Sequence, residues 1–163
     1  MADGSDGRLM HATSADGATW SPFTPVGNRA TGSPAIVAFN NKLYCIYGIN
    51  YPDQYAAAPD GELWMATFDG TQWSASSLPG NRSTAPGAGV GLAVKAGKMY
   101  CAARGPEGDK GLYWATFDGT TWSAFTQIPG AWSADTPNLT NWETAAPHDA
   151  NRLYLTYRGP GTK

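Results

Sequence analysis

The sequence predicts an all-β fold made of repeated antiparallel sheets, and three observations support this prediction. Glycine and proline are abundant, with 20 and 12 residues in a chain of 163, and both disfavour helices and favour turns. Short apolar runs alternate with Asn-Asn, Ala-Gly and Asp-Gly dipeptides, which are typical of hairpin turns. The same order of runs and turns returns about every fifty residues. Repetition at this period is typical of proteins built from stacked supersecondary units.

Two segments recur three times along the chain. The first joins an apolar run, an Asp-Gly turn and a tryptophan, and its copies are residues 9–21, 63–74 and 112–123. The second carries a tyrosine within an apolar run that ends in glycine, and its copies are residues 42–48, 98–105 and 152–159. Each period contains four apolar runs and therefore predicts a four-stranded antiparallel sheet. Successive sheets of this kind are typical of β-propeller blades, and a duplicated β-sandwich is the alternative.

The elements follow the same order in every unit. In the first complete unit, Asn40-Asn41 and Asp69-Gly70 separate apolar runs of strand length. We number the strands of a blade from one to four, from the propeller axis outward. In chain order, the predicted parts are strands three and four of one blade at 8–23, complete blades at about 34–76 and 88–126, and strands one and two of another blade at about 142–158.

The predicted units do not close a ring within one chain. They amount to three blade equivalents, one of them divided between the two ends of the sequence, whereas closed propellers have at least about four blades. We expect a homodimer that closes a six-bladed ring, in which each divided blade is completed by the partner. A trimer with nine blades and a fragment of a longer propeller are the alternatives.

The turn segments share the pattern Ser/Thr-x-Asp-Gly-x-x-Trp. This pattern resembles the Asp-box of sialidase-like propellers, shortened by one residue between Asp and Gly. The general layout resembles that of bacterial and fungal propeller lectins of the tachylectin-2, tectonin and Photorhabdus-lectin kind. The resemblance implies that Asp69 and Asp118 are turn residues and that Trp73 and Trp122 anchor the outer strand in the core. Local turn bonds by aspartate agree with these roles.

The two cysteines occupy the same position in successive copies of the second segment. Cys45 and Cys101 each follow the recurring tyrosine. Equivalent residues in neighbouring packed sheets are about 10 Å apart, which is too far for a disulfide. We therefore expect two free, buried thiols that pack as small apolar side chains.

The candidate ligand-binding residues belong to the long connections, which vary while the strands repeat. We expect these connections to share one rim of the propeller. An aromatic ring beside Asn, Asp or Arg suits a sugar, because the apolar face of a pyranose stacks on the ring while polar groups bond its hydroxyls. For the two Asn-Arg pairs, the alternative is that they cap and brace their loops. The candidates are Asn28, Arg29, Tyr51, Asp53, Tyr55, Asn81, Arg82, Trp132, Asp135 and Trp142.

The sequence therefore predicts a carbohydrate-binding lectin, not an enzyme, whose partners are glycans and a second copy of the chain. Near-identical units would provide several equivalent sugar sites, and multivalency would raise a weak affinity. One alternative is a non-catalytic scaffold propeller, natural or engineered. A less favoured one is a sialidase-like glycoside hydrolase, which by resemblance needs several arginines and a tyrosine paired with a carboxylate in one central pocket. His11 and His148 do not recur, so we expect no metal site and no cofactor.

Other classes of function are disfavoured by composition. Charged residues make up 15% of the chain and the net charge is -2, so we expect neither nucleic-acid binding nor attraction to anionic lipid. No apolar stretch has the length of a membrane span, so we expect no membrane insertion. The first residues lack the basic and apolar segments of a secretory signal. By default this predicts a cytoplasmic location, with non-classical export as the alternative.

Overall fold

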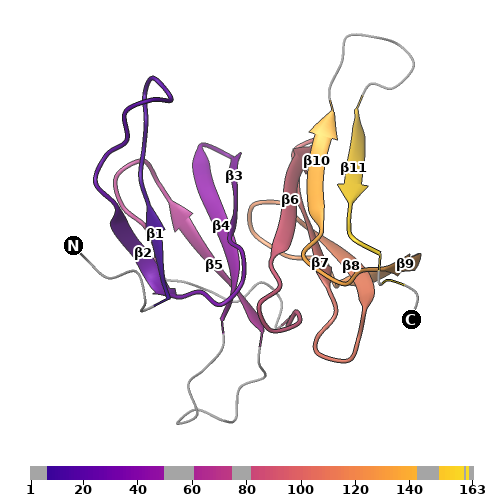
Figure 1. The fold of residues 1–163 in the computed structure, drawn as a ribbon. Coiled ribbons are helices and arrows are strands. Elements are labelled where there is room, and N and C mark those ends of the chain that lie inside the picture. Colours follow the sequence, from indigo (N-terminus) through magenta and orange to yellow (C-terminus); the bar gives the residue numbers. More distant parts are fainter. Residues whose placement is uncertain (1–6, 50–60, 75–81, 143–150, 160, 162–163) are drawn as a thin grey trace.

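The computed structural model describes residues 7–49, 61–74, 82–142, 151–159 and 161 (Figure 1). These residues form strands, turns and loops, and none of them lies in a helix. The described residues therefore contain no helix that could cross a membrane. The predicted all-β class is confirmed for this part of the chain.

Four antiparallel sheets follow one another along the sequence (Figure 1). In each sheet, every strand is hydrogen-bonded to its neighbour in the sequence. The first sheet contains β1 (Arg8–His11) and β2 (Thr24–Arg29), the second β3 (Ala35–Phe39), β4 (Lys42–Ile49) and β5 (Glu62–Phe68), the third β6 (Val90–Lys95), β7 (Lys98–Arg104), β8 (Gly111–Phe117) and β9 (Thr126–Trp132), and the fourth β10 (Asn138–Trp142) and β11 (Arg152–Thr156).

The sequence repeat is also a repeat of register. Tyr44 of β4 pairs with Thr67 of β5, and the equivalent Tyr100 of β7 pairs with Thr116 of β8. The Asn40-Asn41 turn between β3 and β4 has positive φ at both residues, 47° and 57°, as expected of a two-residue hairpin turn. The first three predicted strands of the interior sheets therefore lie where turn chemistry placed them.

The outermost strand begins later than the sequence predicted. Directly after two of the Asp-Gly turns the described residues form single bridges, Phe68 with Trp73 and Phe117 with Trp122, and β9 starts at Thr126. The reason is a recurring side-chain bond in which the serine after the tryptophan accepts a hydrogen bond from a backbone amide, in place of a carbonyl. The three donor-acceptor pairs are Thr13 N to Ser21 Oγ at 3.0 Å, Thr67 N to Ser74 Oγ at 2.9 Å and Thr116 N to Ser123 Oγ at 2.9 Å.

The first strands of the later sheets, β6 and β10, lie side by side (Figure 1). A Cβ added to Gly91 of β6 would stand 2.6 Å from the backbone nitrogen of Leu139 in β10, so only glycine permits this approach. The side-chain amide of Asn141 also donates a hydrogen bond, from Nδ2 to the backbone carbonyl of Val94, at 2.9 Å.

The loop that leaves each outer strand is tied to the sheet that follows. The amide of Thr31 donates to the carbonyl of Gly48 at 2.9 Å, and the amide of Ala134 donates to the carbonyl of Arg158 at 2.8 Å. Gly48 and Arg158 are equivalent positions of the repeat. The fourth sheet therefore follows the third as the second sheet follows the first.

The core lies between sheets, so strands of the interior sheets are apolar on both faces. Leu9 and Val26 of the first sheet pack against Cys45 and Tyr47 of the second. The opposite face of the second sheet packs against the third through a cluster that contains Phe39, Tyr44, Ile46, Leu63, Val90, Met99, Cys101 and Phe117. A third cluster joins the third and fourth sheets.

The predictions for the cysteines are confirmed. Cys45 and Cys101 are both free and buried, and they belong to different inter-sheet clusters. Burial raises the pKa of each thiol to about 12, because a thiolate would lose its hydration in these apolar surroundings. A raised pKa disfavours the thiolate, which is the reactive form of cysteine.

The aspartates of the Asp-Gly turns are turn residues as expected, whereas the tryptophans predicted to lie in the core are only half-buried. Asp69 Oδ1 accepts hydrogen bonds from the amides of Thr71 and Gln72, at 2.8 and 2.9 Å, and Asp118 repeats this arrangement. Trp122 stacks on Phe117 with ring centroids 5.1 Å apart. Trp73 and Trp122 are half-buried against the clusters, so they cover the core from its edge and are not enclosed by it.

Candidate functional site

The candidate site lies at the start of β8, where the third sheet meets the end of the second. Arg82 follows the second sheet, and its backbone carbonyl accepts a hydrogen bond from the amide of Leu63 at 2.8 Å. Its guanidinium carbon lies 3.9 Å from the centre of the Tyr113 ring and 5.4 Å from that of Phe125. The arginine therefore bridges two sheets through a cation–π contact.

A carboxylate completes the cluster. The hydroxyl of Tyr113 donates a hydrogen bond to Asp109 Oδ2 at 2.7 Å, and the amide of Gly111 donates to Asp109 Oδ1 at 2.8 Å. Gly105 and Gly111 leave room for this side chain, because a Cβ on either residue would collide with the Asp109 carboxylate. We call Arg82, Arg104, Asp109 and Tyr113 the rim cluster.

The electrostatics of the rim cluster hold Asp109 in its charged form. The hydrogen bond from Tyr113 is the largest cause that lowers the pKa of Asp109, and Gly111, Arg82 and Arg104 lower it further. The same bond raises the pKa of Tyr113, because ionisation would place two anions side by side. At neutral pH the cluster therefore offers a carboxylate, a phenol and two guanidinium groups.

Both arginines retain unused hydrogen-bonding capacity. The Nε atoms of Arg82 and Arg104 are buried and have no hydrogen-bond partner among the described residues. Both residues are half-buried. Guanidinium groups are suited to bonding carboxylate, phosphate or hydroxyl oxygens.

A related pair lies at the equivalent place in the second sheet. Trp64 occupies the repeat position of Tyr113, and its Nε1 donates a hydrogen bond to Glu62 Oε2 at 3.1 Å. Both side chains are half-buried at the start of β5. Two successive sheets thus place an aromatic residue beside a carboxylate at the same rim.

Trp132 lies next to the rim cluster. It is the last residue of β9 and pairs with Gly111 of β8, and 52% of its surface is exposed. It occupies the repeat position of Arg82 and Arg29. The structure therefore brings two of the predicted residues, Arg82 and Trp132, to the same stretch of β8.

The other predicted residues that the structure describes do not join this cluster. Asn28 and Arg29 lie in β2, where Arg29 is exposed and pairs with Arg8. Asp135 Oδ2 forms an ion pair with the guanidinium of Arg158, at 3.2 Å, and both side chains are exposed. Tyr51, Asp53, Tyr55 and Asn81 lie outside the described residues.

Trp142 lies on the opposite rim from the one predicted. The sequence interpretation placed it at the beginning of a strand, after a long loop. In the structure it is the last residue of β10 and pairs with Arg152, and its ring centroid is 5.6 Å from that of Tyr154. The strand begins four positions earlier, at Asn138. The prediction missed these positions because the period-2 pattern of residues 138–142 is weak and mostly polar.

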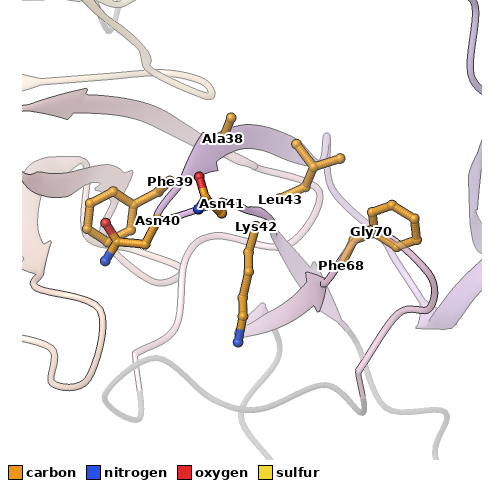
Figure 2. Close-up of a pocket in the computed structure, with 8 residues that line it drawn as sticks. All are labelled: Ala38, Phe39, Asn40, Asn41, Lys42, Leu43, Phe68 and Gly70. Atoms are coloured by element: carbon orange, nitrogen blue, oxygen red, sulfur yellow. The ribbon is translucent and has the colours of Figure 1, made fainter.

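That opposite rim also has a hollow, of about 480 Å³, around the Asn40-Asn41 turn (Figure 2). Phe39, Lys42, Phe68 and Gly70 are among its lining residues. The side chains of Asn40 and Lys42 extend from the turn in Figure 2, and the rings of Phe39 and Phe68 lie on either side of it. No hydrogen bond between these side chains holds them as a group, in contrast to the rim cluster.

Sequence reasoning missed three of the four residues of the rim cluster. The short connection between β7 and β8 contains Asp109 and is flanked by Arg104 and Tyr113. The predicted site residues were taken from the longer connections. One signal was available, since Tyr113 replaces the Trp64 of the preceding repeat and Asp109 stands four residues before it. Their meeting with Arg82 depends on contact between sheets.

The described residues include no group of three or more His, Cys, Asp or Glu side chains that could hold a metal ion. No protein-family model matches the chain, and no curated protein matches it either.

Proposed function

We propose that the protein is a carbohydrate-binding lectin of β-propeller architecture, with sugar sites where successive blades meet at one rim. The rim cluster is the observation that carries this proposal. It combines an aromatic ring, a charged carboxylate and the guanidinium groups of two half-buried arginines, which are the elements that orient a sugar by stacking and by hydrogen bonds. The propeller ring is completed by a second copy of the chain in this proposal.

Repetition supports several sites for each molecule. The Trp64–Glu62 pair lies at the start of the third strand in the second sheet, near where the Tyr113–Asp109 pair lies in the third, although Glu62 aligns with Gly111 and not with Asp109. The two pairs differ in size and in the presence of Arg104, so they would bind related sugars with different affinities. Multiple weak sites on one particle raise the avidity for a glycan-coated surface.

Binding is tested on a glycan array, followed by calorimetry with neutral, uronic and sialic acid sugars. We expect millimolar or tighter binding of at least one sugar by the wild type, and a loss of about tenfold or more for Arg82→Ala. Thr120→Ala, an exposed turn residue, is the matched control and should bind as the wild type. The absence of binding to every sugar at millimolar concentration would contradict the proposal.

A sialidase-like hydrolase is the second candidate, because one observation favours it. Tyr113 is paired with the carboxylate of Asp109 and lies close to Arg82, which is part of the set of residues that the resemblance to sialidases requires. The raised pKa of Tyr113 works against this candidate, since a nucleophilic tyrosine needs an accessible phenolate. Turnover of a fluorogenic sialoside that is abolished by Tyr113→Phe would favour the hydrolase over the lectin.

A further inference from the structure

The first and fourth sheets each contain only half of the strands found in the third. In the interior sheets the second strand pairs with the third, as β4 pairs with β5 and β7 with β8. Within the described residues β11, a second strand, pairs only with β10, and β1, a third strand, pairs only with β2. Each of these edges presents backbone groups to which another strand can pair.

An open apolar surface lies beside the edge of β11. It is a hollow of about 280 Å³ between the third and fourth sheets, lined entirely by apolar surface that includes Tyr100, Ala102, Trp114, Ile128, Leu153 and Leu155. Trp114 is 39% exposed, and its ring stacks on Tyr100 with centroids 6.1 Å apart. Exposed apolar surface of this kind marks an interaction site.

The β1–β2 hairpin carries a matching set of apolar side chains. Met10, Trp20 and Phe23 are 40%, 60% and 70% exposed. Trp20 and Phe23 occupy the repeat positions of Trp122 and Phe125, which pack in the cluster that joins the third sheet to the second. The hairpin therefore presents the face that an interior sheet uses to cover its predecessor.

We propose that the β1–β2 hairpin of a second copy of the chain pairs with β11 and covers the hollow at Trp114, and that the exchange is reciprocal. The interior sheets determine the register. Tyr47 pairs with Trp64 and Ala103 with Tyr113, and the equivalent pair at the junction is Tyr157 with Met10 of the second copy. This proposal rests on the proposed propeller arrangement and not on sugar binding.

The occupant is a second copy because the chain already contains both halves of this interface. The contact between the first and second sheets shows that the β1–β2 hairpin packs against a sheet of this repeat through Leu9 and Val26. Reciprocal exchange also covers Ile36 of β3, which is 57% exposed, since the partner's β10–β11 would then precede the second sheet. Two copies related by a two-fold axis satisfy both edges.

The register is tested by intermolecular disulfide formation in the variant Met10→Cys/Tyr157→Cys. Directly opposite residues of an antiparallel pair have Cα atoms about 4.5–5.5 Å apart, within the range of a disulfide. The matched control is Met10→Cys/Thr156→Cys, whose second cysteine points to the other face of the strand. The native cysteines are buried and do not compete. We expect the first variant to give a covalent species of twice 17.2 kDa after mild oxidation, and the control to give little of it.

Other results would overturn the proposal. A monomeric mass for the wild type in sedimentation at micromolar concentration would exclude the interface. A three-chain species or a ladder of higher species would exclude the two-copy ring, and equal cross-linking of both variants would exclude the register. As a variant without new cysteines, Trp20→Glu should dissociate the dimer, whereas Thr120→Glu, which adds the same charge at an exposed turn, should leave its mass unchanged.

Discussion

The guanidinium of Arg82 lies 3.9 Å from the centre of the Tyr113 ring, although these residues belong to successive sheets. This contact joins the end of one repeat to the start of the third strand in the next. Asp109 accepts the phenolic hydrogen of the same tyrosine at 2.7 Å, so an arginine, an aromatic ring and a carboxylate are held together. The boundary between these two sheets therefore carries charged and polar side chains that contact one another.

Asp109→Asn should weaken sugar binding without unfolding the chain. Asparagine has one oxygen that can accept the bond from Tyr113, but it loses the second acceptor, which the Gly111 amide uses, and it removes the charge that Arg82 and Arg104 face. We expect a loss of about tenfold in affinity, or roughly 1.4 kcal/mol, measured by calorimetry. Because the pKa of Asp109 is lowered, wild-type affinity should stay constant from pH 8 to pH 5 and fall only in more acidic solution. The same affinity for both proteins at pH 7 would remove Asp109 from the site.

Trp132→Ala should weaken sugar binding and leave the melting temperature nearly unchanged. The side chain is half-exposed at the end of β9, beside Gly111. Loss of an aromatic stacking platform costs on the order of 1–3 kcal/mol, by analogy with base stacking. Trp132→Phe is the matched control and should retain most of the affinity. Unchanged binding by the alanine variant would locate the sugar away from Trp132.

Trp122→Ala should destabilise the fold, because the ring stacks on Phe117 and Phe125 at the edge of the core. The expected loss is about 2–3 kcal/mol in denaturant unfolding, below the roughly 3–5 kcal/mol of a fully buried tryptophan, since Trp122 is half-buried. Trp122→Phe should cost much less. Its indole Nε1 is buried with no hydrogen-bond partner among the described residues, so phenylalanine removes an unsatisfied group. Equal losses for both variants would contradict this account.

Gly91→Ala should destabilise the contact between β6 and β10. The added methyl would stand 2.6 Å from the backbone nitrogen of Leu139 and 2.9 Å from the carbonyl carbon of Asn138. A backbone strand must shift to admit it, which costs about 1–3 kcal/mol. Gly159→Ala, where a Cβ meets nothing within 4 Å, is the control. A Gly91→Ala variant as stable as the wild type in urea would show that the two strands are further apart.

The Asp-Gly turns should make stability depend on acidity. Hydrogen bonds from backbone amides lower the pKa of Asp69 from 3.8 to about 2, and those of Asp16 and Asp118 are lowered for the same reason. A group whose pKa is lower in the folded state stabilises fully above its unfolded pKa and loses that contribution as pH falls. The melting temperature should therefore be constant near neutral pH and fall from about pH 4 toward pH 2.

The double variant Asp69→Asn/Asp118→Asn tests this origin. Asparagine can accept the same amide hydrogens but does not titrate, so its melting temperature should change less between pH 5 and pH 2. A wild-type and a double variant with parallel pH profiles would assign the acid sensitivity to other carboxylates.

The strands of the interior sheets were predictable because their signals are local. Residues 62–68 form β5 as expected, and the Asn40-Asn41 and Asp69-Gly70 turns border the strands that they predicted. The outer strand was predicted to begin too early. The bond from Thr116 N to Ser123 Oγ interrupts the backbone hydrogen bonds of the sheet, and no pattern of apolar residues marks this interruption in the sequence. In the rim cluster, the repeat singled out Arg82, whereas Asp109 lies in the short connection between β7 and β8 and Tyr113 follows it in β8.

The sequence by itself determined the all-β class, the order of the strands and the unpaired state of Cys45 and Cys101, because periodicity, turn residues and repeat position act over short distances. Only the tertiary structure decided which faces meet. The contact between Arg82 and Tyr113, the approach of Gly91 to Leu139 and the exposure of Trp20 and Trp114 depend on how one sheet packs against the next. Apolar patterns show that a face is buried, but they do not specify the surface that covers it, since hydrophobic attraction has no direction of its own.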